Sequence, residues 1–87
     1  MRFEFDPAKS AANHSKHGID FVDAQSIWRD ADRLEIPARS SGERRWQMIG
    51  RHGDKIWSAF YTYRSDAIRI ISVRRARRDE EAVYLET

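Results

Sequence analysis

The 87-residue sequence contains no cysteine, only two prolines and only four glycines. Without cysteine the chain can form no disulfide, no thiolate metal site and no cysteine nucleophile. No apolar run approaches the roughly 20 residues that a membrane-spanning helix needs. The first six residues, Met-Arg-Phe-Glu-Phe-Asp, also lack the apolar segment of a secretory signal. We therefore expect a cytoplasmic protein that makes no contact with a membrane.

Charge is distributed unevenly along the chain. The length predicts one domain spanning residues 1–87, and the 40% of hydrophobic and 34% of charged residues are typical of a folded domain with a strongly ionised surface. The whole chain has 16 basic and 14 acidic residues, but the stretch from Arg39 to Arg78 has eleven basic residues and three acidic ones. Most of the eleven are arginine, whose planar fork suits phosphate groups. This half of the chain therefore favours a polyanionic partner.

The N-terminal third predicts a strand followed by two helices. Residues 2–5 alternate as a strand does, and Asp6-Pro7 is a strong start signal for a helix that runs to about His17 and ends before Gly18. The small residues expected to pack this helix on a sheet are Ala8, Ala11, Ala12 and Ser15. Asp20 predicts the cap of a second helix, with an apolar face made by Phe21, Ala24, Ile27 and Trp28.

The rest of the chain predicts four strands and a last helix. A short strand at residues 34–36 is expected to stop at Pro37. Strands at 44–51, 55–63 and 67–74 follow, joined by connections short enough for hairpins, and a helix spans about 78–85. The order β-α-α-β-β-β-β-α predicts an α+β fold, with two N-terminal helices on one face of a mainly antiparallel sheet. The other face is expected to stay partly open, and a ligand would lie there.

Several kinds of chemistry lack the residues that they need. His14 and His17 are close enough in sequence to share an ion, but no third ligand is evident at matching spacing. No serine lies in a nucleophile-elbow motif, and no glycine-rich phosphate loop is present. We therefore expect no metal and no other cofactor. Chemistry that uses only cations and a proton shuttle remains, as in RNA cleavage by the 2′-hydroxyl group of the substrate.

Candidate residues for such chemistry fall into four places. The first helix carries Lys9, Asn13, Lys16 and His17 beside its alanine face, and residues 42–45 place Glu43 next to Arg44 and Arg45. Trp57, Tyr61 and Tyr63 share one face of a strand that ends at Arg64, where they could stack on RNA bases or form part of the core. The last strand ends at Arg74-Arg75, whose side chains should point to opposite faces, so only one of them is expected to reach the open face.

The sequence also resembles the BrnT toxins of type II toxin–antitoxin systems along nearly its whole length. The matching segments are Phe5-Asp6-Pro7 with Lys9, Asn13 with Lys16-His17-Gly18-Ile19, Phe21 and Ala24, Gly42-Glu43-x-Arg45, Ile49-Gly50-Arg51, Tyr61-Thr62-x-Arg64, Arg69-Ile70-Ile71-Ser72-x-Arg74-Arg75-Ala76, and Glu80 with Tyr84. The resemblance implies a fold similar to RelE-type ribonucleases, RNA cleavage without metal and arrest of translation. It also implies neutralisation by a BrnA-like antitoxin whose ribbon-helix-helix portion binds operator DNA, so that the toxin would reach DNA only through the antitoxin.

The combined interpretation is a metal-independent endoribonuclease. Arg64 and Arg74 are expected to hold the scissile phosphate with help from Arg45 and Lys16, and His17 and Glu43 are the candidates for proton transfer. The residues expected to contact RNA elsewhere are Trp57, Tyr61, Arg51 and Arg75. An Arg74→Ala variant is expected to lose toxicity and stay folded. Two alternatives remain open: a non-catalytic RNA-binding module, and a protein-interaction subunit of a DNA-bound repressor.

Overall fold

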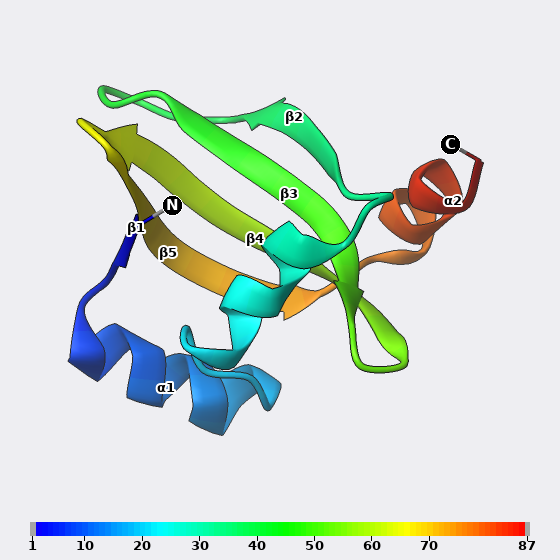
Figure 1. Ribbon diagram of the computed structural model, residues 1–87, viewed down its shortest axis with the longest axis horizontal. Coiled ribbons are helices and arrows are strands. Elements are labelled where there is room, and N and C mark those ends of the chain that lie inside the picture. The colour runs from blue at the N-terminus through cyan, green and yellow to red at the C-terminus, as the bar shows by residue number, and fades with distance from the viewer. Residues whose placement is uncertain (1, 87) are drawn as a thin grey trace.

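The computed structural model describes residues 2–86 and has mixed α+β architecture (Figure 1). A five-stranded sheet is accompanied by two α-helices and one 3₁₀ helix. In chain order the elements are β1 (Arg2–Glu4), α1 (Pro7–His17), η1 (Asp23–Arg29), β2 (Leu34–Ala38), β3 (Arg45–His52), β4 (Lys55–Arg64), β5 (Ala67–Arg75) and α2 (Arg78–Glu86). No helix in this part of the chain has the length and apolar character to cross a membrane.

The sheet has the strand order β1-β5-β4-β3-β2. Strand β1 runs parallel to β5, and all other neighbours are antiparallel. Both predicted hairpins are confirmed, because β3 pairs with β4 and β4 with β5 through short turns. Strand β2 extends through Pro37, where a stop was expected. Proline is tolerated there because β2 lies at the sheet edge, where a strand needs hydrogen bonds on one side only.

The second N-terminal helix differs from the prediction. Asp20 does accept hydrogen bonds from the backbone N–H groups that follow it, but the segment then forms the 3₁₀ helix η1 and not an α-helix. Phe21, Ala24 and Ile27 are fully buried. Residues three apart line up along a 3₁₀ helix, so this form directs Ala24 and Ile27 toward the sheet, and Phe21 lies just before the helix begins. The prediction of two N-terminal α-helices is therefore wrong for this segment.

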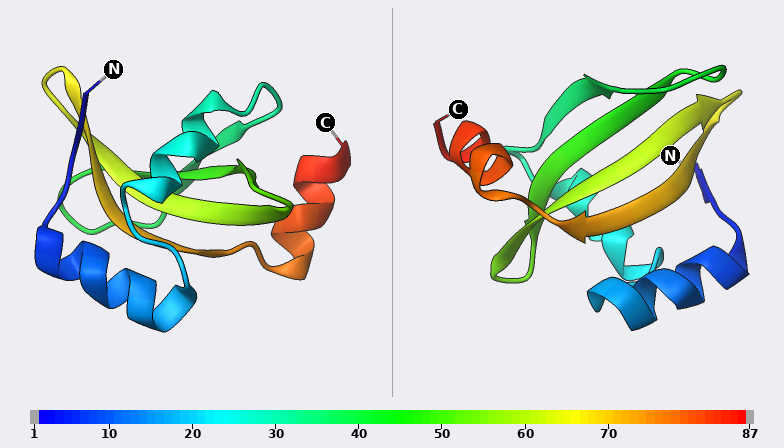
Figure 2. Two further views of the ribbon diagram at one scale, coloured as in Figure 1. Left: turned by 60° about the horizontal axis from the view of Figure 1, so that its bottom comes forward. Right: turned by 180° about the vertical axis from the view of Figure 1, so that it is seen from behind.

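Glycine at position 50 permits the close approach of η1 to β3. A Cβ atom at Gly50 would lie 2.8 Å from Cγ2 of Ile27 and 3.3 Å from the Ile27 carbonyl oxygen. Any larger side chain would push η1 away from the sheet. In Figure 1 η1 lies in front of the sheet, and in the right-hand view of Figure 2 it lies behind it, so it covers one face.

Helix α1 packs on the sheet through a different face from the one predicted. Its start and end are as expected, with the Asp6 side chain accepting from the Ala8 N–H and Gly18 in the left-handed conformation. The alanine face, however, is exposed, and Ser10 and Asn13 are buried. The reason is that β1 pairs only with the first residues of β5, so the edge of β5 is unpaired farther along. There the Asn13 side-chain amide bonds to both the N–H and the C=O of Val73, at 3.1 and 2.9 Å. A polar side chain therefore completes the edge of β5.

Side chains alternate between the two faces of the central strand β4. On the side of η1, the buried residues of β4 are Trp57, Ala59 and Tyr61. On the other side, which we call the open face, the buried residues are Ile56, Ser58 and Thr62, and Phe60 is partly exposed. Helix α2 covers one end of the open face, where Tyr84 packs with Ile49 and Ile56. The rest of this face carries no helix, as the sequence predicted.

Candidate functional site

A hollow on the open face is lined mainly by arginine. Its volume is about 340 Å³, and Phe60 of β4 forms part of its wall. The lining residues are Ala38, Arg39, Arg45, Phe60, Ile71, Ser72, Arg74 and Arg77. We call this site the Phe60 hollow. Every charged residue in its lining is an arginine: Arg39 and Arg45 come from the connection between β2 and β3 and from the start of β3, and Arg74 and Arg77 come from the end of β5 and the connection to α2.

Strand β5 carries a bulge beside the Phe60 hollow. Phe60 pairs with Ser72, but the next residue, Tyr61, pairs with Ile70, so Ile71 is an extra residue in the register. Bulges bend a strand and redirect its side chains, and they are frequent next to active sites. Neighbouring residues of a regular strand point to opposite faces, whereas here both Ile71 and Ser72 line the hollow. The bulge therefore shapes the hollow.

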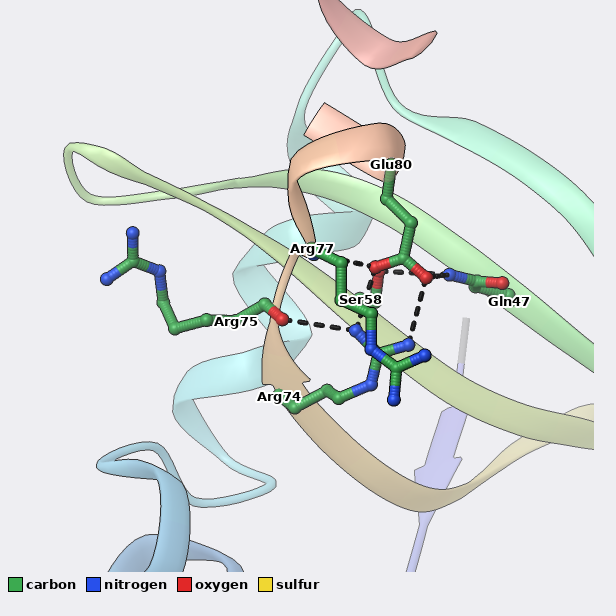
Figure 3. Close-up of polar contacts among 6 residues, drawn as sticks. All are labelled: Gln47, Ser58, Arg74, Arg75, Arg77 and Glu80. Atoms are coloured by element: carbon green, nitrogen blue, oxygen red, sulfur yellow. Dashed lines mark hydrogen bonds and ion pairs between the residues drawn. The ribbon is translucent and has the colours of Figure 1, made fainter. Parts of the chain in front are cut away.

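Arg74 is held in place by a carboxylate from α2 (Figure 3). Its two terminal nitrogens donate to the two oxygens of Glu80 at 2.7 and 2.9 Å. The same carboxylate accepts hydrogen bonds from the Gln47 side chain at 2.8 Å, the Ser58 hydroxyl at 3.0 Å and the Arg77 backbone N–H at 2.9 Å. Both side chains of the ion pair are largely buried, with exposed fractions of 22% for Arg74 and 15% for Glu80. This network joins α2 to β3, β4 and β5.

The network changes the proton affinity of Glu80. The Arg74 guanidinium, together with the other donors, lowers the pKa of Glu80 from 4.5 to about 2, even though burial acts in the opposite direction. In the unfolded chain the carboxylate regains its ordinary pKa. Its contribution to stability is therefore complete above about pH 4.5 and is lost as the pH falls toward 2.

A Glu80→Gln variant tests this linkage, because its neutral amide does not titrate. Between about pH 6 and about pH 3 the wild-type protein should lose about 2 kcal/mol more of its free energy of unfolding than the variant does. Urea denaturation at the two pH values measures the difference. Parallel losses in the two proteins would show that Glu80 has an ordinary pKa in the folded state.

The other three arginines of the Phe60 hollow have no acidic partner in the part of the chain that the structure describes. Within residues 2–86, the ion pairs of arginine involve Arg2, Arg64 and Arg74, and none involves Arg39, Arg45 or Arg77. All three of these side chains belong to exposed residues. The charge of Arg74 is balanced by Glu80, so the hollow carries a net positive charge from the remaining three. A group with several negatively charged oxygens suits this arrangement.

The comparison with known protein families agrees with this geometry. The family model of BrnT, described as the ribonuclease toxin of a type II toxin–antitoxin system, matches residues 5–80. The chain belongs to the BrnT family. The matched range includes every residue that lines the Phe60 hollow, and Glu80 is its last residue. No curated protein matches the sequence. As a BrnT toxin, the protein has RNA as its target and an antitoxin as its partner.

Arg45, Arg64 and Arg74, which we expected to act together in this BrnT toxin, do not all line the same site. Arg45 and Arg74 line the same hollow, as the sequence led us to expect. Arg64 does not line it, and its guanidinium pairs instead with Glu43 at 3.3 Å. Both of these side chains are about half exposed, so their pairing contributes little to stability. Arg64 and Glu43 therefore form a separate surface pair of the BrnT fold.

The two candidates on α1 also lie away from the hollow. Lys16 and His17 are at the end of a helix that packs along β5 through Asn13, and neither lines the Phe60 hollow. His14, on the same helix, is exposed. Within residues 2–86, no three histidine, aspartate or glutamate side chains are grouped so that they could hold a metal ion.

Two of the three aromatic candidates of the BrnT toxin belong to its core, whereas Tyr63 is 47% exposed. Tyr61 has no exposed surface and Trp57 is 7% exposed, because both face η1. The expectation that these rings stack on RNA bases is therefore wrong, and they are core residues instead. Arg75 lies over the Trp57 ring, 5.6 Å from its centroid, so Arg74 and Arg75 do point to opposite faces, as predicted. Arg51 lies over the Tyr84 ring, at 5.9 Å, outside the hollow.

Sequence reasoning missed Phe60, Arg39, Arg77 and Glu80 as parts of one site. Phe60 could have been found by strand alternation, because it lies between Ala59 and Tyr61 and must face away from them. Glu80 lies in the first turn of α2, and its spacing of three residues from Arg77 is typical of a capping interaction. Its bond to Arg74 depends on how α2 turns back onto the sheet, which leaves no local signal.

Proposed function

We propose that this BrnT toxin is a metal-independent endoribonuclease that binds the scissile phosphate of RNA in the Phe60 hollow. The observation that carries this proposal is that all four charged residues of the hollow are arginines. Guanidinium groups bind phosphate oxygens by paired, charge-assisted hydrogen bonds. The hollow lies on the open face, so a chain as large as RNA can reach it.

The proposed reaction uses the 2′-hydroxyl group of the substrate as nucleophile. Its oxygen forms a bond to the adjacent phosphorus, and the bond from phosphorus to the 5′-oxygen of the next nucleotide breaks. The products carry a 2′,3′-cyclic phosphate and a 5′-hydroxyl group. Negative charge increases on the phosphate oxygens in the transition state, and Arg45 and Arg74 stabilise it. Arg74 is held in position by Glu80 beforehand, so little reorganisation is needed.

Proton transfer is assigned to water in this proposal. Glu80 is the carboxylate that bonds to Arg74, but it is a weak base because its pKa is about 2 and both of its oxygens already accept hydrogen bonds. His17 and Lys16 on α1, and Glu43 beside Arg64, are not part of the lining of the hollow. The site therefore contributes phosphate binding and charge stabilisation.

The family supports further proposals about the cellular role. Cleavage of RNA would inhibit translation in the cytoplasm, and a BrnA-like antitoxin would neutralise the toxin. A ribbon-helix-helix portion of that antitoxin would bind operator DNA and bring the toxin to it. An N-terminal helical segment followed by a mainly antiparallel sheet also supports a fold of the RelE type.

Incubation of the purified toxin with RNA in the presence of EDTA tests the proposed reaction. We expect cleavage, with products that end in a 2′,3′-cyclic phosphate and begin with a 5′-hydroxyl group. Mass spectrometry of the fragments identifies these ends. Intact RNA together with a gel shift would instead support a binding module. Intact RNA without a shift, from a toxin that still binds its antitoxin, would support an interaction subunit.

A further inference from the structure

Two further hollows lie on the face of the sheet opposite the Phe60 hollow. One has a volume of about 430 Å³ and is lined by Trp28, Ala31, Arg33, Glu35, Met48, Tyr63 and Ile68. The other has a volume of about 380 Å³ and is lined by Phe3, Gln25, Trp28, Arg29 and Arg33. Because they share Trp28 and Arg33, we treat them as one surface and call it the Trp28 groove.

The floor of the Trp28 groove is apolar and aromatic. Met48 and Ile68 belong to the core cluster, and the Trp28 ring contacts Phe3 and Tyr61 edge to face, with centroids 5.1 and 5.0 Å apart. The Trp28 indole N–H is shielded from solvent and has no hydrogen-bond partner within residues 2–86. A small tilt of this ring toward an acceptor on a bound molecule would therefore lose no hydrogen bond.

The rim of the Trp28 groove combines two arginines that form no ion pair within residues 2–86 with one carboxylate that already accepts hydrogen bonds. Arg29 and Arg33 are exposed, and neither forms an ion pair within the described chain. Glu35 accepts hydrogen bonds from the hydroxyl groups of both Tyr61 and Tyr63. Burial and these hydrogen bonds raise the pKa of both tyrosines, so they remain donors to Glu35 at neutral pH.

We propose that the Trp28 groove binds a segment of the antitoxin that carries an apolar side chain next to acidic ones. The apolar side chain would fill the hollow over Met48 and Ile68, and the acidic groups would pair with Arg29 and Arg33. RNA fits less well, because the floor formed by Met48 and Ile68 is apolar and offers the bases no hydrogen-bond partner, and because the Tyr63 hydroxyl is already bonded to Glu35. This inference rests on the antitoxin partner of the family and is independent of the proposed cleavage reaction, since its readout is binding.

Two alanine-to-tryptophan variants on opposite faces of the sheet test the proposal. Ala31 lines the Trp28 groove and is exposed, so Ala31→Trp fills the groove and removes no core contact. Ala38 lines the Phe60 hollow, and Ala38→Trp fills that site in the same way. With the toxin and its antitoxin purified from co-expression, we expect Ala31→Trp to weaken binding by roughly tenfold or more and to cleave RNA at the wild-type rate. We expect Ala38→Trp to reduce RNA cleavage and to bind the antitoxin as the wild type does.

A charge reversal supplies a second test that does not depend on steric fit. Arg33→Glu places a negative charge on the rim of the Trp28 groove and should also weaken antitoxin binding by roughly tenfold. Lys55→Glu is the matched control, because Lys55 is an exposed residue at the start of β4 and lines neither site. Calorimetry measures the affinities, and thermal melting of each variant confirms that it is folded.

The results would overturn the proposal in either of two cases. In the first, antitoxin binding does not depend on the groove, and Ala31→Trp and Arg33→Glu bind the antitoxin as tightly as the wild type. A loss of antitoxin binding in Ala38→Trp would have the same meaning, because it would place the antitoxin over the Phe60 hollow. In the second, the groove variants lose affinity for a 2′-O-methylated RNA oligonucleotide, which cannot be cleaved, but keep their affinity for the antitoxin. The second result would identify the groove as an RNA site. RNA cleavage by the wild type is measured separately, so its absence would affect only the proposed function.

Discussion

Replacement of Arg74 by alanine is expected to lower the free energy of unfolding by about 2–4 kcal/mol. The substitution leaves the largely buried carboxylate of Glu80 without the partner that donates to both of its oxygens. The Arg74 guanidinium also lies 5.1 Å from the centroid of the Phe60 ring, and this contact is lost as well. For a domain of this size, such a change corresponds to a fall in melting temperature of roughly 10–25 °C.

The loss should be specific to the pairing of the two side chains. A double-mutant cycle with Arg74→Ala and Glu80→Ala measures their interaction. We expect the double variant to be more stable than the sum of the two single changes predicts, because it leaves no unpaired charge. Urea denaturation of the four proteins provides the energies. If Arg74→Ala melts at the temperature of the wild type, the ion pair does not hold α2 on the sheet.

This role of Arg74 changes how its variants must be interpreted. The sequence alone predicted that Arg74→Ala would stay folded and lose activity. The structure adds a cost in stability, so loss of activity in this variant does not separate phosphate binding from a loosened α2. A residue of the same hollow that supports no other element is a better probe of the chemistry.

Features that depend on a few neighbouring residues could be predicted from the sequence. Asp6 and Pro7 begin a helix and Gly18 ends it, because capping involves backbone groups within one turn. The strands of the two hairpins were predicted within about one residue at either end for a similar reason. Their turns are short, so the pairing of each strand follows from that of its neighbour.

Features that depend on distant residues could not be predicted in this way. Asn13 is buried because it bonds to Val73, which is 60 residues away, and an apolar pattern on α1 suggested the opposite face. The sequence showed that this half of the chain is rich in arginine. It could not show that Arg74 pairs with Glu80, or that Arg64 pairs with Glu43 outside the Phe60 hollow. Charge content was therefore predictable, whereas charge pairing required the fold.

Arg45 is the residue whose loss should separate catalysis from stability. It is exposed on β3, lines the Phe60 hollow and forms no ion pair within residues 2–86. Arg45→Ala should therefore melt within a few degrees of the wild type. Its rate of RNA cleavage should fall by roughly 100-fold to 1000-fold, because a cation is removed from the position where negative charge increases in the transition state.

Arg75→Ala is the matched control for Arg45→Ala. Arg75 is also an exposed arginine at the end of a strand, but it points to the opposite face, over Trp57. Its loss should leave the cleavage rate within roughly twofold of the wild type. Single-turnover cleavage of a labelled RNA measures both variants. Equal losses of rate in the two would mean that the arginines attract RNA only through their overall charge, and an active Arg45→Ala together with an inactive Arg75→Ala would move the reaction to the opposite face of the sheet.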